Sequence, residues 1–216
     1  MDNWLEFFNY TRFLDRDGKF QLTMHSVSGF DPLSRSMTPM LKEESFHLGT
    51  GNNGLLRIAK AGKMPPELIQ KFFYKWIPTA FDLFGTDHSS SAHWAYVWGL
   101  KGRYDERDNQ AEPDKAKLNE YSRELYRQEI SKLVERLNMF IPERERQLKV
   151  PDLKFNRRIG MYAHQHFTVD GQPIDAAKYP AYLESVLPRP EDIARVHDIE
   201  KEPDWIEPKK ADSLQQ

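Results

Sequence analysis

Apolar residues recur at helical spacing along most of the chain, and polar residues fill the positions between them. The first such stretch begins at Trp4, and a second one follows the turn signal Ser-Gly-Phe-Asp-Pro of residues 28–32. This pattern predicts two antiparallel helices that form a hairpin over residues 1–62. Asp31 is expected to cap the second helix, with Pro32 at its first position.

Further helices are predicted from the proline and serine residues that typically begin or end a helix. They are expected to start at residues 65–67 (with Pro78 bending or ending that helix) and 89–92, and to span 113–140, 176–186 and 191–199. Only residues 167–169 have a modest strand signal. The sequence therefore predicts an all-α protein with one continuous domain. Its parts are the hairpin (1–62), further helices packed on it (63–148) and an irregular C-terminal extension with short helices (149–216).

Two local features make more specific predictions about packing. The aromatic residues at helical spacing, Trp94 and Trp98 among them, are expected in the core. Gly49, Gly51 and Gly54 lie within the second helix of the hairpin. They predict either a break in that helix or a close contact with another helix.

Asp15, Glu44 and His47 are the candidate site residues, because the hairpin would bring them to one level. The midpoint between positions 15 and 44 falls in the turn, so each helix climbs ~20 Å from the turn to its carboxylate at ~1.5 Å per residue. His47 follows Glu44 by three residues and shares its face of the helix. Apolar residues near this pair suggest a buried face, where an unpaired carboxylate is costly: Met37, Met40, Leu41, Leu48 and Leu55.

A carboxylate facing a Glu-x-x-His motif is half of the ligand set with which ferritin-like bundles hold two irons. Carboxylates can bridge two metal ions, and a neutral imidazole supplies a nitrogen ligand. A second Glu-x-x-His or Asp-x-x-His in a comparable context does not occur in the chain. The alternative interpretation is a solvated Glu–His pair, since this spacing arises by chance in many helices.

Several blocks of the sequence resemble, in order, the family of benzoyl-CoA 2,3-epoxidase oxygenase components. The blocks begin in the hairpin and continue almost to the C-terminus: residues 13–22 (FLDRDGKFQL), 28–35 (SGFDPLSR), 40–47 (MLKEESFH), 82–85 (DLFG), 99–103 (GLKGR), 155–160 (FNRRIG) and 205–206 (WI). The resemblance covers most of the chain. Members of the family are about twice as long, so this chain is similar to their C-terminal half.

The resemblance implies a function, a cofactor and partners. The fold would be half of a ferritin-like di-iron four-helix bundle, with Asp15, Glu44 and His47 as iron ligands. The chain would be the C-terminal part of a di-iron monooxygenase of aerobic aromatic degradation, which epoxidises the ring of an aryl-CoA thioester with O2. Electrons would come from NADPH and flavin in a separate reductase, and the N-terminal half or a second chain would complete the iron site. Pro39 and Phe46 depart from the family pattern beside Glu44 and put pocket shape and iron affinity in question.

Composition narrows the class of protein further. Basic and acidic residues nearly balance, at 31 and 33, which gives no reason to expect nucleic acid as a partner. The chain has no cysteine, so disulfides and Cys-ligated iron–sulfur clusters within it are excluded. It has no apolar run long enough to span a membrane and no signal-peptide pattern, which predicts a cytoplasmic protein. Residues 49–54 (GTGNNG) have Gly-x-Gly-x-x-Gly spacing, but they lie within a predicted helix and follow no strand, so they are not a dinucleotide fingerprint and electrons are expected to come from outside the chain.

Two other classes of function remain open, together with weaker candidate residues. The chain could be a catalytically incomplete metal-binding or scaffold protein, or a half-bundle completed by symmetric dimerisation. A loop or packing role is favoured over metal binding for His164 and His166, and capping with solvent exposure is favoured for His88 and His93. Coenzyme A phosphates and ordinary surface roles are equally open for the basic residues. These weaker candidates are His88, His93, His164, His166, Lys101, Arg103, Arg157 and Arg158.

Overall fold

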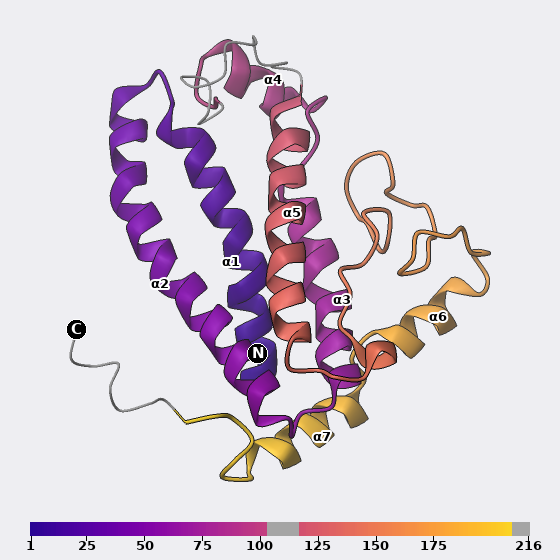
Figure 1. The fold of residues 1–216 in the computed structure, drawn as a ribbon. Coiled ribbons are helices and arrows are strands. Elements are labelled where there is room, and N and C mark those ends of the chain that lie inside the picture. The colour runs from indigo at the N-terminus through magenta and orange to yellow at the C-terminus, as the bar shows by residue number, and fades with distance from the viewer. Residues whose placement is uncertain (103–116, 209–216) are drawn as a thin grey trace.

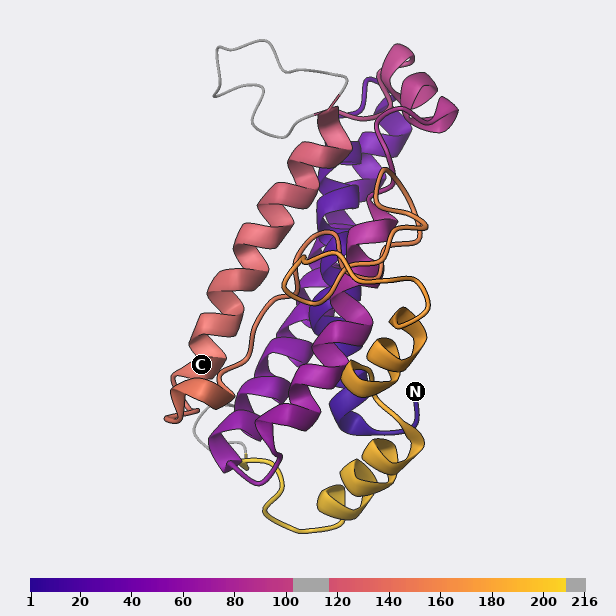
Figure 2. The same cartoon turned by 90° about the vertical axis from the view of Figure 1, so that its right-hand side faces the viewer.

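Four long helices lie side by side in a bundle in the computed structural model, which describes residues 1–102 and 117–208 (Figure 1). They are α1 (Trp4–Ser26), α2 (Asp31–Ala61), α3 (Pro66–Leu83) and α5 (Leu118–Asn138). The short helix α4 (Ser90–Val97) covers one end, and α6 (Tyr179–Val186) and α7 (Pro190–Glu200) flank α3 and the other end (Figure 2). The predicted all-α class and the hairpin are confirmed.

Across the two described ranges there is no strand. The candidate at residues 167–169 contributes only an isolated antiparallel bridge between Phe167 and Pro173. The modest strand signal therefore yields no more than this bridge, because no neighbouring segment offers a ladder of backbone hydrogen bonds, and the all-α prediction stands.

Phenylalanine side chains fill the core where α1, α3 and α5 meet. Phe13, Phe73 and Phe81 are completely buried, and the rings of Phe13 and Phe73 meet edge to face at 4.8 Å. The buried Tyr126 of α5 donates a hydrogen bond of 3.0 Å from its hydroxyl to the Phe13 carbonyl. The Phe residues thus lie in the core as predicted. Each fully buried large apolar side chain contributes ~1.5–3 kcal/mol.

Trp94 of α4 and Trp98, the residue that caps its C-terminus, are exposed and do not lie in the core. Trp94 is 49% exposed and Trp98 is 67% exposed, and their rings pack on one another with centroids 5.5 Å apart. The prediction that they are buried was wrong, because helical spacing identifies a shared face but not what covers it. Ser89 does cap this helix, accepting a hydrogen bond from the Ala92 amide.

Two predicted helix boundaries also need correction. The residue that caps α2 is Phe30, and Asp31 lies in the first turn, where its carboxylate pairs with Arg35. Pro78 neither ends α3 nor separates it from the core, since the helix continues to Leu83 with Pro78 itself buried. Burial of the surrounding apolar face outweighs the hydrogen bond that a proline removes.

Glycines of α2 allow the hairpin to close tightly. A Cβ atom built on Gly51 would lie 2.6 Å from the Arg12 amide nitrogen, and one on Gly54 would lie 2.3 Å from the Phe8 ring. The helix is continuous through these glycines. They mark a close helix contact, which was one of the two predicted alternatives, and not a break.

Candidate metal site

The structure brings Asp15, Glu44 and His47 together between α1 and α2. Each residue offers one ligand atom, and these atoms all lie within 4.8 Å of one another. Two helices folded back at residues 28–30 place positions 15 and 44 at one level, as the count along the sequence predicts. In the part of the chain that the structure describes, this is the one such cluster of three or more acidic or histidine residues.

Glu44 is more enclosed than His47. Its side chain is 15% exposed, and its Oε1 atom is buried without a hydrogen-bond partner. Gly18 of α1 lies beside this oxygen, since a Cβ atom at position 18 would be in ordinary contact with Oε1 at 3.6 Å. Sequence reasoning did not identify Gly18 as a neighbour of the site, although a glycine one helical turn after Asp15 shares its face of the helix.

His47 completes the cluster from the solvent side. Its Nδ1 atom lies 3.5 Å from Glu44 Oε2, and its side chain is 52% exposed. The apolar residues of α2 near Glu44 suggested a buried face, but they differ in their exposure to solvent. Met37 and Leu48 are buried, whereas Met40 is 46% exposed.

The surroundings of Asp15 and Glu44 raise the pKa of both carboxyl groups. Burial raises the pKa of Asp15, and the charge of His47 opposes that rise. Burial and then the negative charge of Asp15 raise the pKa of Glu44, while His47 again opposes. Tyr10, another residue that sequence reasoning missed, has a pKa raised by burial and by the charges of Asp15 and Glu44. Negative charge is therefore concentrated here without a fixed cation to neutralise it.

A divalent metal ion fits this arrangement. It would neutralise the two carboxylates and satisfy the orphaned Glu44 oxygen, and two carboxylates with one imidazole are a ligand set that suits iron. The cluster offers one side of a site only. A second set of ligands would have to approach from the outer side, where His47 and Asp15 are accessible.

The weaker candidates mostly have structural roles. Arg157 is buried and donates to Asp82 at 2.6 Å, so it is not a surface group that could meet a phosphate. Lys101 donates to Gln21 and Asn119, and burial lowers its pKa. Arg158 is exposed, and Arg103 lies outside the described residues.

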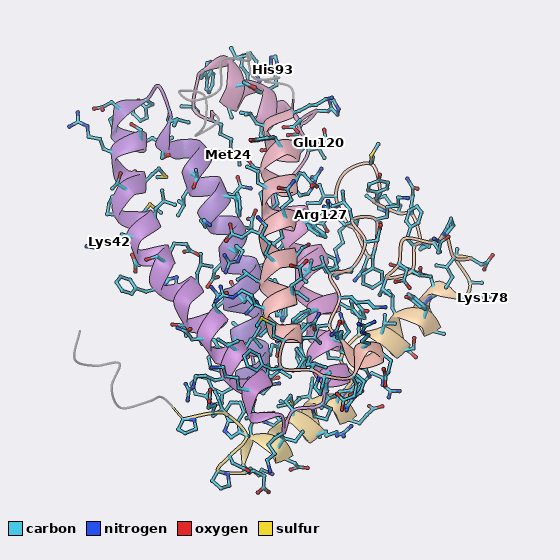
Figure 3. All side chains as sticks on the ribbon, in the orientation of Figure 1. Met24, Lys42, His93, Glu120, Arg127 and Lys178 are labelled. Atoms are coloured by element: carbon cyan, nitrogen blue, oxygen red, sulfur yellow. The ribbon has the colours of Figure 1, made fainter. Side chains whose placement is uncertain are left out.

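His164 and His166 have the loop and packing roles that were favoured for them, and His88 and His93 are exposed, as expected. His164 has a positive φ of 64° in an irregular segment, and the His166 ring packs on Tyr179 with centroids 4.6 Å apart. His93 packs on Trp94, at the end of the bundle where Figure 3 labels it, and His88 lies just before that helix.

An all-α bundle with Asp facing Glu-x-x-His across two antiparallel helices defines one half of a ferritin-like carboxylate–histidine site. The chain is 30% identical to "Benzoyl-CoA oxygenase component B" of Aromatoleum evansii, over an alignment covering 91% of this chain and 51% of that protein. It thus spans about half the length of that relative, which confirms the predicted partial resemblance. No protein-family model matches. Among the described residues, no helix is both long enough and apolar enough to cross a membrane.

Proposed function

We propose that this chain is the C-terminal part of a di-iron monooxygenase that epoxidises the aromatic ring of an aryl-CoA thioester. The observation that carries the proposal is the convergence of Asp15, Glu44 and His47 in a chain that resembles an oxygenase component over 91% of its length. The relative's name specifies benzoyl-CoA. A benzoyl-CoA-like thioester is therefore the proposed substrate.

Each site residue has a defined task in this proposal. Asp15 and Glu44 are the anionic ligands, and His47 supplies the nitrogen ligand of one iron. A complete pair of irons would supply the activation of O2. One oxygen atom would enter the ring as an epoxide, and the other would leave as water with two electrons and two protons. The hairpin contributes by holding the three ligand atoms on two helices that are already packed together.

The proposal requires partners of two kinds. A reductase must supply the electrons, drawn from NADPH through a flavin. A second set of ligands, a carboxylate and another Glu-x-x-His, must come from an N-terminal half or a second chain. The outer side of α2 is where this set would pack, because among the described residues only Met37 is buried in the half of that helix from Asp31 to His47.

The decisive experiment uses a preparation that contains this chain together with the second ligand set, loaded anaerobically with ferrous iron. With reductase and NADPH, we expect benzoyl-CoA-dependent O2 consumption and an epoxide that carries one atom of ¹⁸O from ¹⁸O2. Glu44→Gln should abolish both, whereas Glu43→Gln, at the exposed neighbouring position, should keep them. Failure of the iron-loaded assembly to consume O2 or convert the thioester would refute the function.

Solution mass separates this proposal from the symmetric dimer. A dimer would contribute two copies of each ligand residue and formally restore six ligands. A monomeric chain that binds about one iron by itself, and a second iron only with the second ligand set, would leave the half-bundle interpretation standing. A dimer that loads two irons by itself would replace it.

A further inference from the structure

Arg12 is a buried cation on the other side of the hairpin contact from Glu44. Its side chain lies where α1, α2 and α5 meet, and it is among the largest completely buried side chains in the described part of the chain. One terminal nitrogen donates to the Leu133 carbonyl at 2.7 Å. Its Nε atom is buried and has no hydrogen-bond partner.

The surroundings of Arg12 add positive charge and no compensating negative charge. Burial, and then the charges of Arg16 and Arg136, lower the pKa of Arg12 to about 9, so the guanidinium is still charged at neutral pH. The carboxylate of Glu129 in α5 accepts hydrogen bonds from Arg16 and Lys19. Over the residues that the structure describes, no carboxylate forms an ion pair with Arg12 or Arg136.

A buried arginine without an anion is an unusual arrangement, because charged side chains are almost never fully buried unless they are paired. The cost of removing an ion from water is several kcal/mol unless a counter-charge repays it. The Phe13 ring, 5.8 Å from the guanidinium carbon, offers only a weak cation–π contact. Arg12 is therefore a buried cation that has no carboxylate partner among the described residues.

A small pocket opens beside this cation. Its volume is about 200 Å³, and its lining residues include Arg12 of α1, Arg136 of α5, and Asn52 and Asn53 of α2. Gly49 leaves space on the α2 side, since nothing lies within 4 Å of a Cβ atom built there. Two arginines and two asparagines thus line one space, with no acidic residue among the lining residues, and the Asn52 Oδ1 atom already accepts a hydrogen bond from Arg16 at 2.8 Å.

We propose that this pocket is a binding site for a small oxyanion, with Arg12 at its base and Arg136 at its rim. Guanidinium groups form charge-assisted hydrogen bonds with phosphate and carboxylate oxygens, and amide N–H groups can add further donors. The volume admits a single phosphate or small carboxylate. It is below the ~300 Å³ at which pockets for drug-sized ligands begin, so the aryl-CoA itself does not fit.

This site is independent of the proposed iron centre. Its lining residues on α2 are Gly49, Asn52, Asn53 and Leu56, whereas Glu44 and His47 meet Asp15 between α1 and the preceding part of α2. Either site can therefore fail its test without affecting the conclusion about the other.

Inorganic phosphate is the probe for the test, titrated against chloride at constant ionic strength and pH 7. Binding is followed by ³¹P line broadening and by the melting temperature of the chain. We expect a saturable rise in melting temperature with phosphate. Arg136→Gln, at an exposed position that should not affect folding, is expected to weaken binding about tenfold, the usual effect of losing one charged hydrogen bond.

Two further variants make the result decisive. Lys132→Gln removes the same charge from an exposed position of α5 outside the pocket, and it should bind phosphate as the native chain does. Arg12→Met should abolish binding. If Arg12→Met does not fold, the comparison of Arg136→Gln with Lys132→Gln decides alone. The proposal is overturned if phosphate has no saturable effect, or if those two variants bind it equally well.

Discussion

The two halves of α2 differ sharply in what surrounds them. From Leu48 to Ala61 the helix packs into the bundle, with Leu55 and Ile58 completely or almost completely buried. From Asp31 to His47 only Met37 is buried, and Lys42 points away from the bundle on the outer edge of the molecule (Figure 3). Two of the three candidate iron ligands, Glu44 and His47, lie in this open half, and Asp15 faces them from α1.

The packed half of α2 thus contributes mainly to stability, whereas the open half carries the candidate ligands. The packed half holds the register of the hairpin, because its glycines and apolar side chains admit only one close approach to α1. The open half presents Glu44 and His47 at the position that this register sets. A functional cluster on an otherwise weakly covered segment is expected where a further element must still pack.

Truncating one apolar side chain in each half gives the largest predicted contrast. Leu55→Ala, in the packed half, should lower the free energy of unfolding by ~2–5 kcal/mol. Met40→Ala, at a position that is 46% exposed, should change it by no more than ~0.5 kcal/mol. Urea denaturation of both variants measures the contrast. Equal losses would mean that the open half is packed in solution.

The glycine contact is the next largest effect. Gly51→Ala would push a methyl group against the α1 backbone, which cannot move aside, and should cost ~1–3 kcal/mol. Gly49→Ala is the matched control in the same helix. It has open space around the new methyl group and should stabilise the chain by ~0.5–1 kcal/mol through helix propensity. The same sign for both variants would contradict the close approach.

Glu129 makes the stability of the packed region depend on pH. Burial alone would raise its pKa, but the Lys19 hydrogen bond and the charges of Arg16 and Lys19 outweigh burial and lower it. A lowered pKa means that the stabilisation is present above the unfolded value of ~4.3 and is lost as the pH falls through the folded value. Glu129→Gln should therefore lower the melting temperature at pH 7, and this loss should become smaller as the pH is lowered below ~4.3. An equal loss across this range would show that charge is not the cause.

The smallest predicted effect on stability is at the site itself. Glu44→Gln keeps the shape of the side chain and removes a carboxylate that faces Asp15, so the free energy of unfolding without metal should change by ~0.5 kcal/mol or less. Phe46→Ala, at a position that is 67% exposed, should be equally small. A loss above ~2 kcal/mol for Glu44→Gln would assign this residue a structural role and weaken the metal interpretation.

The hairpin and the site were predictable because both follow from local rules. A turn signal fixed where the helices fold back, and the constant rise of a helix then placed Asp15 opposite Glu44. Features that depend on distant neighbours were not predictable in this way. Whether Trp94 is covered, whether Pro78 ends a helix and whether Arg12 meets an anion all depend on which segments pack there.

The C-terminal extension illustrates the same limit. Arg157 looked like a surface cation in the sequence, yet it donates to Asp82, whose carboxylate also accepts the Arg158 amide at 2.8 Å. This pairing across 75 positions fixes the extension to α3. Nothing in the local sequence around either residue identifies the other as its partner.

The most direct test of the account is iron uptake by the chain under anaerobic ferrous loading. We predict roughly one specifically bound iron per chain, the share of half a di-iron ligand set. Asp15→Asn, Glu44→Gln and His47→Gln should each lose it, while Glu43→Gln keeps it. Equal uptake by all five proteins, or no specific iron in the native chain, would contradict the claim that these three residues form a metal site.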